Sequence, residues 1–308
     1  MDATELRART AWGLVSQPGD ALAWHLQRTL GPEEALGRML EPPNSSRLDI
    51  PGLSSAAVAA AFSQYRSHYC EERVTRAIQI QRHENIVALS ADHPWWPVGV
   101  DDLGDKAPST LWIKGSLHGA TVSPAVAIVG SHIPTWRGRS ATLALGDTAL
   151  RVGLTLVGGG TRGITTDAHR RVITGGGISV AILPGGIDTA YPPENAALFG
   201  RMTQRGALIS EAPCTQEPSL ERFLARNRLI AAMSDGVAIV EAEFRSAAIS
   251  VAYHAAALGR HVGVVPGLWG DTRSAGCWRI YRECGAMVLT EPAELSLLVP
   301  GVNYPSSS

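Results

Sequence analysis

The middle of the chain contains two consecutive units of strand, glycine turn and helix, and this repeat restricts the possible folds more than any other feature. In the first unit, the apolar run Val126–Val129 ends at Gly130 and precedes a helical pattern of apolar residues. In the second unit, the β-rich run Leu154–Val157 leads into the glycine turn Gly158–Gly163, and a helix is predicted to open near Ile164. Strands joined in this way are expected to lie parallel in one sheet.

Both glycine turns have the character of an anion-binding site. Glycines after a strand allow the backbone to approach an anion closely, and the following helix directs unpaired N–H groups and the positive end of its dipole at the same point. Side by side, the two turns would form a floor for phosphate groups. Basic side chains outnumber acidic ones in this stretch, with Arg137, Arg139, Arg162, Arg170 and Arg171 against Asp147 and Asp167.

The alternation of strand and helix continues towards the end of the chain. Apolar runs without polar alternation indicate buried strands, and helical patterns separate them. The predicted strands are Ile178–Leu183, Ala207–Ser210, Val237–Val240, His261–Val265 and Met287–Leu289, and the predicted helices cover 193–205, 219–233, 246–258 and 279–283. This pattern predicts an α/β fold with a doubly wound, mostly parallel sheet covered on both faces. Ligands of such folds bind outside the carboxyl ends of the strands, where the glycine turns fall.

The beginning of the chain differs from the rest, because its helical spacing is interrupted by proline–glycine pairs. We expect a small all-helical N-terminal module over residues 1–90 that packs on the rest of the chain or contacts a partner. A proline-rich connector over 91–120 contains the predicted strand 110–113, the α/β domain covers 121–300, and a tail covers 301–308. Trp95 and Trp96 in the connector could stack on bases, but we favour a role in pinning the connector to the domain surface.

Composition excludes several classes of protein. With 308 residues, of which 45% are hydrophobic, the chain can bury a sizeable core. Its net charge of -1 means that affinity for nucleic acid must come from a local patch, and its basic residues, nearly all arginine, suit bidentate phosphate contacts. The four cysteines have no zinc-site spacing, and neither a signal peptide nor a bilayer-spanning run is present. We therefore expect a cytoplasmic protein with reduced thiols.

Two motifs that contain arginine indicate a possible binding function. The turn GGGTRG matches neither a dinucleotide fingerprint nor a Walker loop, and no acidic residue stands where a ribose would need one, so NAD is disfavoured and no cofactor is predicted. The second motif, Arg226-Asn227-Arg228, falls within the predicted helix 219–233. It could be a solvated arginine pair, which is usual on a charged helix face, or a fork for phosphate with an amide for a base or sugar. The residues alone leave both interpretations open.

No catalytic group stands out. Glu211 and Glu241 each end a predicted strand and would suit general acid–base chemistry, but we favour a role in capping the next helix or holding arginines such as Arg226. His169 has no nucleophile near it in the sequence, so a structural histidine is expected. In the proline-rich loop after strand 178–183, Tyr191 could stack a base, although the prolines also explain the segment as a rigid loop.

Taken in order, these motifs resemble those of the DprA/Smf family of bacterial DNA-processing proteins over roughly residues 90–295. AIVGSH with the following WRG is similar to the family's VGxR...YG turn, GGGTRGITTDAH to its SGxARGIDxxAH, and ILPGGIDTAYPPEN to its VLGxGLDxxYPxxN. GALISEAP, RNRLIAAMS, VAIVEAEFRSAAISVA and GRHVGVVPG then follow in the family's order. No single motif is decisive, but their collinear order is highly specific.

The resemblance implies an extended Rossmann-like domain that binds single-stranded DNA through its phosphates, protects it and helps to load the RecA recombinase. It also implies a homodimer, a role in DNA recombination and natural transformation, and no catalytic activity. We therefore predict a non-enzymatic DNA-binding protein without a membrane partner. The candidate DNA ligands at the motif positions are Gly130, Ser131, His132, Arg137, Gly160, Arg162, Gly163, Gly185, Arg226, Asn227, Arg228 and Ser246.

Several positions depart from the family pattern. His132 stands where arginine is usual, and histidine is a weaker and pH-dependent cation. Gly158 replaces the usual serine and Thr165 the usual aspartate of the second motif, Ala247 lies in the SGS-like turn, and Trp278 replaces the usual asparagine. The winged-helix tail of many members is not expected, since the sequence ends in PGVNYPSSS. We infer a divergent member that has lost polar groups at the binding edge.

Two other functions are compatible with the same fold. Related proteins of the LOG type hydrolyse nucleoside monophosphates with a PGG loop followed by GTxxE; Leu183–Gly186 begins like that loop, but Ile187-Asp188-Thr189 does not continue it. Alternatively, the pocket binds a small nucleotide as a sensor and signals through the helical module. A nucleotide retained through purification would favour the sensor.

Overall fold

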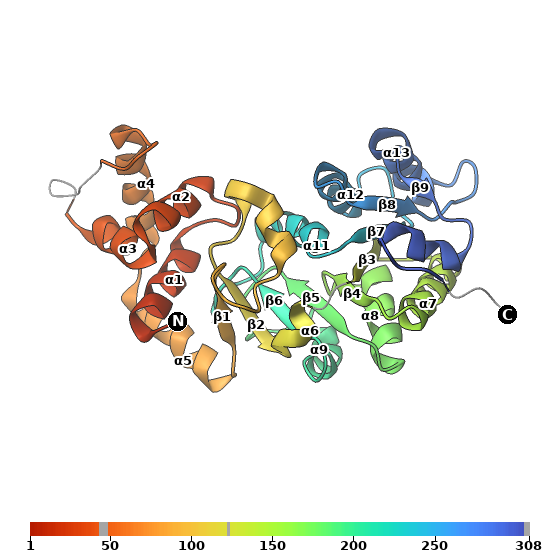
Figure 1. Cartoon of the computed structure of the whole chain (residues 1–308), viewed down its shortest axis with the longest axis horizontal. Helices are drawn as coiled ribbons and strands as arrows, with labels where there is room; N and C mark the ends of the chain where they lie inside the picture. Colours follow the sequence, from red (N-terminus) through yellow and green to blue (C-terminus); the bar gives the residue numbers. More distant parts are fainter. Residues whose placement is uncertain (43–48, 122–123, 305–308) are drawn as a thin grey trace.

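The computed structural model describes residues 1–42, 49–121 and 124–304. A sheet of nine strands runs through the described part (Figure 1), in the order β1-β2-β6-β5-β4-β3-β7-β8-β9. All pairings from β6 to β9 are parallel, whereas β2 is antiparallel to both β1 and β6. The strands are β1 Val87–Leu89, β2 Leu111–Gly115, β3 Ala125–Gly130, β4 Thr155–Gly158, β5 Ser179–Leu183, β6 Ala207–Ser210, β7 Gly236–Val240, β8 His261–Val264 and β9 Met287–Val288.

The central strands are apolar at almost every position because helices cover both faces of the sheet. Alternate residues of β3 belong to different cores: Ala127 and Val129 pack with α11, α12 and α13, whereas Val126 and Ile128 pack with α7 and α8. The helices that follow the strands are α6 Leu117–Thr121, α7 Trp136–Arg151, α8 Ile164–Thr174, α9 Ala196–Met202, α10 Leu220–Ala225, α11 Asn227–Ala232, α12 Ala248–Ala257 and α13 Ala275–Cys284. The predicted α/β fold with a mostly parallel sheet is confirmed.

The strand order places a switch point between β3 and β7. From β3 the chain passes to β4, β5 and β6 on one side, and it then returns to β7, β8 and β9 on the other side. The crossovers after β3 and β7 therefore lead away from each other at the carboxyl edge of the sheet. Open α/β sheets bind their ligands at such a point.

Five of the described helices precede the sheet in the chain and occupy the left of Figure 1. Asp2, Asp20 and Ser54 cap three of them by accepting hydrogen bonds from the first backbone N–H groups. Trp12 and Trp112, both fully buried, belong to one apolar cluster, so the helices share a core with one face of the sheet. The helices are α1 Ala3–Val15, α2 Ala21–Leu30, α3 Pro32–Leu40, α4 Ser55–His68 and α5 Glu71–His83. The proposed division of the chain at residues 90 and 120 remains a prediction.

Local differences from the predicted elements concern short segments. The predicted helix 219–233 is two helices, α10 and α11, that meet at Arg226. The predicted helix 193–205 is the 3-10 turn Pro193–Asn195 followed by α9. Strand β1 lies within the stretch predicted as helical, and α6 was not predicted, because elements of three to five residues are too short to show a period. Residues 305–308 of the predicted tail lie outside the described residues.

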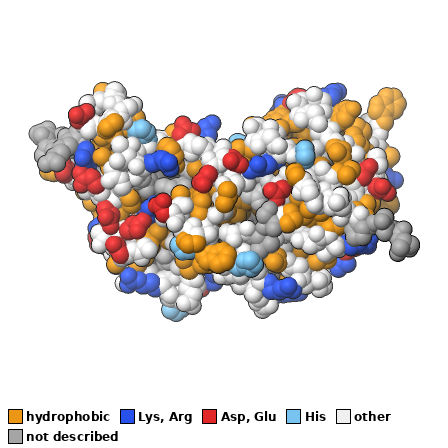
Figure 2. Space-filling model, in the orientation of Figure 1, with side chains coloured by type: hydrophobic (Ala, Val, Ile, Leu, Met, Phe, Trp, Pro, Cys, Tyr) orange, Lys and Arg blue, Asp and Glu red, His pale blue; other side chains and the backbone are white. Residues whose placement is uncertain are grey.

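The connector packs on the domain through Trp96, and the surface carries charges of both signs (Figure 2). Trp96 is buried and its Nε1–H donates to Asp101 at 2.9 Å, as expected for a residue that pins the connector, whereas Trp95 is half exposed. In Figure 2, acidic side chains gather over the N-terminal helices, while basic side chains are spread along the whole face. Among the described helices, none combines the length and the apolar character that a membrane span requires.

Candidate functional site

The two predicted glycine turns are in contact at the carboxyl edge of the sheet. Gly163 has a φ of 75°, and a Cβ atom there would lie 2.3 Å from the carbonyl oxygen of Ser131, so only glycine fits between the turns. The Ile164 N–H at the start of α8 donates to this same oxygen at 3.1 Å. The turns therefore lie side by side as predicted, but one amide at the helix start is used inside the protein and is not free for an anion.

Arg226 lies beneath the second turn. Its Nη1 donates to the carbonyl oxygens of Gly159 at 2.6 Å and Ile182 at 3.0 Å. A Cβ atom on Gly159 would lie 2.8 Å from Nη2, so this glycine leaves room for the guanidinium. The guanidinium carbon also lies 4.5 Å from the centre of the Phe223 ring. Only 6% of Arg226 is exposed, and backbone and ring together hold its charge in one place.

The buried charge of Arg226 has no carboxylate to balance it. Within the described ranges, no acidic group forms an ion pair with Arg226, and its Nε has no hydrogen-bond partner. Burial lowers the pKa of Arg226 to about 9, which leaves the group protonated at neutral pH. Burying an unpaired charge is costly, and an anion at this edge would offset the cost. The geometry therefore favours an anion beside Gly159 and Gly160.

Two further basic groups belong to the same electrostatic field. Burial lowers the pKa of His132, and the positive charges of Arg226 and Arg162 lower it further. Arg162 is exposed, and its guanidinium pairs with Glu194 from the loop after β5. An incoming phosphate would compete with this carboxylate for Arg162.

An aromatic pair completes the region. The rings of Tyr191 and Phe223 lie edge to face, with centroids 5.4 Å apart. Phe223 contacts Arg226, while Tyr191 is 41% exposed and offers a ring to a base. Fixed cations beside an open aromatic ring suit a single-stranded nucleic acid, whose phosphates and bases alternate. We call this set the glycine-turn site: His132, Gly159, Gly160, Arg162, Tyr191, Phe223 and Arg226.

Phe223 of this site and two residues that contact it, Glu194 and Asn195, were not among the predicted ligands. Asn195 is buried, and its Nδ2 donates to the Gly160 carbonyl at 2.8 Å and to the Thr166 hydroxyl at 2.7 Å, which fixes the turn against α8. The available signal was their position at the ends of recognised motifs, YPPEN and FLARNR. Their partners are distant in sequence, so periodicity does not reveal the contacts.

The rest of the Arg226-Asn227-Arg228 motif faces other parts of the protein. Arg228 is 4% exposed, its Nη2 pairs with Glu211 at 2.7 Å, and its Nε donates to the Lys106 carbonyl at 2.9 Å. Asn227 is also buried, and its amide donates to a backbone carbonyl of the β7–α12 loop at 3.3 Å. A solvated arginine pair is therefore wrong. Glu211 does hold an arginine, but it is Arg228 and not Arg226; contact of Asn227 and Arg228 with phosphate stays a prediction.

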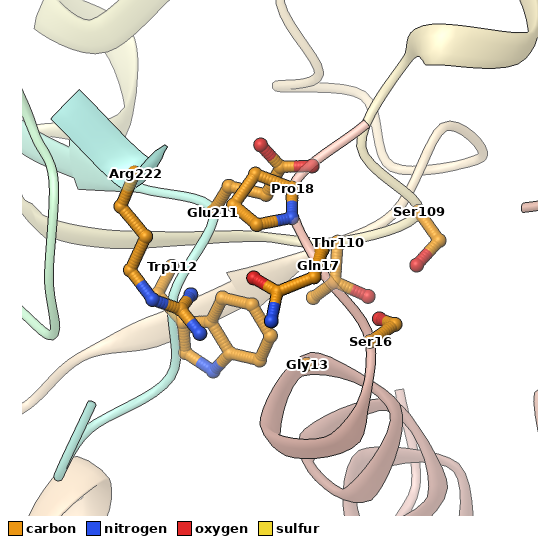
Figure 3. Close-up of a pocket in the computed structure, with 9 residues that line it drawn as sticks. All are labelled: Gly13, Ser16, Gln17, Pro18, Ser109, Thr110, Trp112, Glu211 and Arg222. Atoms are coloured by element: carbon orange, nitrogen blue, oxygen red, sulfur yellow. The ribbon is translucent and has the colours of Figure 1, made fainter. Parts of the chain in front are cut away.

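Glu211 also connects the sheet to the N-terminal helices. The Gly19 N–H, in the turn between α1 and α2, donates to its carboxylate at 3.2 Å. Figure 3 shows the small cavity at this junction, about 30 Å³, where Gln17 and Pro18 lie beside Glu211 and Arg222. The segment that carries Arg226 and Arg228 is thus held by the glycine turn on one side and by the N-terminal helices on the other.

The turn after β5, which contains the predicted ligand Gly185, is filled by protein. A Cβ atom on Gly185 would lie 2.8 Å from the Gln216 carbonyl, and the Gly185 carbonyl accepts from the Ser210 hydroxyl at 2.7 Å. A nucleotide hydrolase of the LOG type would need this turn at its substrate. The packing of residues 216–218 against it gives that alternative no support.

Four predicted ligands lie on the side of β3 and β7. A Cβ atom on Gly130 would lie 1.7 Å from the Val240 carbonyl, so strand packing requires this glycine. The Ser131 hydroxyl accepts from a backbone N–H within its own turn at 3.1 Å. Arg137 is exposed at the start of α7, and Ser246 lies half-buried in the loop after β7. Gly130 and Ser131 shape the edge through their backbone, whereas Arg137 and Ser246 present side chains.

His169 has a structural role, as favoured from the sequence, and Glu241 also has one, but at the start of α7 and not at the helix that follows its own strand. Glu241 accepts from the Thr135 N–H at 2.8 Å and from the Thr135 hydroxyl, which fixes the start of α7. His169 is fully buried with Nδ1 2.6 Å from the Ser179 hydroxyl, and burial lowers its pKa to about 3, so the ring is neutral. In the part of the chain that the structure describes, no three His, Cys, Asp or Glu residues are grouped so that they could hold a metal ion.

Sequence comparison relates the chain to known DNA-processing proteins. The model of the family described as DNA recombination-mediator protein A matches residues 87–299. The DNA processing protein DprA of Mycobacterium tuberculosis is 38% identical over 300 residues, which cover 92% of this chain and 73% of that protein. The protein Smf of Escherichia coli is 35% identical over 208 residues, which cover 67% of this chain and 55% of Smf.

Solved structures extend the similarity to the N-terminal helices. The X-ray structure of DNA processing protein A from Streptococcus pneumoniae superposes with a TM-score of 0.75 at 24% identity, over 99% of both chains. The structure of DNA processing protein A from Helicobacter pylori, which concerns its single-stranded DNA binding mode, superposes with a TM-score of 0.61 at 26% identity, over 68% of this chain and 93% of that one. The fold is therefore shared along nearly the whole chain.

Proposed function

Because this chain belongs to the DNA recombination-mediator protein A family, whose relatives carry the names DprA and Smf, we propose that it binds single-stranded DNA in DNA processing. The phosphates of the strand bind at the glycine-turn site, and a base contacts the open ring of Tyr191. The single-stranded DNA binding mode described for the Helicobacter pylori relative supports this proposal.

The observation that carries the proposal is the buried guanidinium of Arg226, which has no carboxylate partner in the described residues. A structural arginine in a protein interior is normally paired, as Arg228 is with Glu211. Arg226 instead meets two carbonyl oxygens and a glycine turn at the sheet edge, and the positive charges of Arg226 and Arg162 both act on His132 in the first turn. A phosphodiester supplies the missing negative charge without reading sequence.

Fluorescence anisotropy of a labelled oligo-dT, measured at low and physiological salt, tests the proposal. We expect tight binding that weakens steeply with salt, and Arg162→Ala should lower the affinity and reduce the salt slope by about one phosphate contact. The matched control is Arg76→Ala, which removes an exposed arginine from α5, away from the sheet edge, and should leave both quantities unchanged. Binding that is insensitive to salt, or equal losses in the two variants, would contradict phosphate binding at the glycine-turn site.

Two finer properties follow from the family alone. We propose that the protein delivers the bound strand to a RecA-type recombinase and that it acts as a homodimer. Light scattering after size-exclusion chromatography measures the mass in solution, and a strand-exchange assay in the presence of single-strand-binding protein measures delivery. A monomer at micromolar concentration would contradict the homodimer, and no stimulation of strand exchange would contradict delivery to the recombinase.

A further inference from the structure

A second concave region lies on the other side of the β3 turn, at the switch point of the sheet. This cavity has a volume of about 590 Å³ and is enclosed by the carboxyl ends of β7 and β8, the start of α7 and the loop Pro266–Ser274. Its size suits a small ligand such as one nucleotide. Thr135 and Trp136, which line the cavity, come shortly after Ser131 and His132 of the first glycine turn in the chain. We call it the switch-point cavity.

The walls of the switch-point cavity offer apolar surface to a ligand. Trp136, which carries a large aromatic side chain, is 74% exposed, and Leu268 on the loop after β8, which also lines the cavity, is 59% exposed. The guanidinium of Arg137 lies 5.3 Å from the centre of the Trp136 ring. An exposed indole carrying a cation beside an open cavity is an arrangement on which a base can stack.

The charges around the cavity favour an anionic ligand. Arg137 and Arg273 both line it, and in the described ranges neither forms an ion pair with a carboxylate. The two carboxylates of the lining are already engaged: Glu241 accepts from the backbone and hydroxyl of Thr135, and Asp271 accepts from the backbone N–H of Arg273 at 2.9 Å. Both carboxylates keep their negative charge but are held by donors of the protein itself, whereas the guanidinium groups of Arg137 and Arg273 are free to donate to a phosphate next to the stacked base.

We propose that the switch-point cavity is a second subsite for single-stranded DNA, which takes one nucleotide with its base on Trp136 and its phosphate towards Arg137 and Arg273. This inference rests on the proposed DNA binding and extends the track of the strand from the glycine-turn site across residues 131–135. A nucleotide within a strand and a free nucleotide would make the same contacts in this subsite. The strand is favoured because only Ile133 and Pro134 separate His132 of the glycine-turn site from Thr135 of the cavity along the chain.

The test compares a normal oligo-dT with an abasic oligonucleotide of equal length, using the full chain. We expect Trp136→Ala to weaken binding of oligo-dT by about tenfold and to leave binding of the abasic strand unchanged, because the lost contact is to a base. Trp136→Phe should restore most of the loss. Trp95→Ala removes a half-exposed tryptophan from the connector and serves as the control that should change neither affinity.

Each other outcome overturns a different claim. Equal weakening of both strands by Trp136→Ala, or no weakening, would remove the base-stacking subsite while leaving the phosphate site intact. No binding of either strand by the wild-type chain would remove the proposed function itself. Competition by free dTMP that is abolished in Trp136→Ala, without any difference between the two strands, would assign the cavity to a free nucleotide instead of a strand.

Discussion

Arg226 and Arg228 are two residues apart on the same short segment, and both are buried, but they have opposite electrostatic surroundings. Arg228 pairs with Glu211 at 2.7 Å and meets the Lys106 carbonyl, so its charge is neutralised inside the protein. Arg226, in the part of the chain that the structure describes, contacts two carbonyl oxygens and the Phe223 ring and forms no ion pair. One arginine therefore completes the fold, and the other holds an unbalanced positive charge at the sheet edge.

The break between α10 and α11 at Arg226 produces this division. Arg226 is the last residue before α11 begins, and it reaches the turn after β4 and the end of β5. Arg228 lies within α11 and reaches the end of β6, where the Gly19 N–H of the N-terminal helices also binds Glu211. Burial alone thus does not distinguish a structural arginine from a ligand-binding one; the presence of a carboxylate does.

The largest expected effect is the loss of stability on breaking the Arg228 pair. Arg228→Ala leaves the carboxylate of Glu211 without its partner, and the free energy of unfolding should fall by about 3–5 kcal/mol. Urea denaturation followed by circular dichroism measures this change. Arg226→Gln should cost far less, because it removes a charge that no carboxylate among the described residues neutralises. Equal destabilisation by the two variants would mean that the two arginines do not differ as described.

Binding should show the reverse order. Arg226→Gln removes the unbalanced charge beneath the glycine turn, so the affinity for oligo-dT should fall by about tenfold or more, equally for every DNA sequence. Inorganic phosphate should raise the melting temperature of the wild-type protein, and this increase should vanish in Arg226→Gln, because ligands stabilise the state that binds them. Arg201→Gln, an exposed arginine on α9, is the matched control. A variant that keeps both the affinity and the phosphate effect would refute Arg226 as the anion site.

The same pair of arginines shows how much of the fold and of the site can be predicted from the sequence. The apolar runs predicted the strands of the parallel sheet, because continuous burial leaves a continuous apolar pattern. The two glycine turns predicted an anion-binding edge, because their requirement is local in the chain. The sequence favoured Glu211 as a partner of an arginine but named Arg226 in place of Arg228, since Ile182 and Glu211 are brought to the two arginines by the tertiary fold. The motif alone therefore left a solvated pair and a phosphate fork equally open.

The smallest expected effect concerns His132, which lies near Arg226 and carries a positive charge only when its ring is protonated. In the free protein, burial and the charges of Arg226 and Arg162 hold its pKa below the ordinary value of 6.5, so the ring is neutral at pH 7. A bound phosphate raises this pKa, and binding then takes up a proton. The affinity for oligo-dT should therefore rise as the pH falls from 8, by at most about tenfold per pH unit, and level off below the pKa of the free ring.

Other groups near His132 do not share this behaviour. Arg162 and Arg226 stay protonated, Glu194 stays ionised because Arg162 lowers its pKa, and the pKa of about 3 keeps His169 neutral throughout. His132→Arg should therefore bind more tightly at pH 8 and lose the pH dependence, whereas His132→Ala should lose it without the gain. Anisotropy titrations from pH 5.5 to 8 at constant ionic strength measure all three proteins. A pH dependence that survives in His132→Ala would assign the proton to another group and remove His132 from the phosphate site.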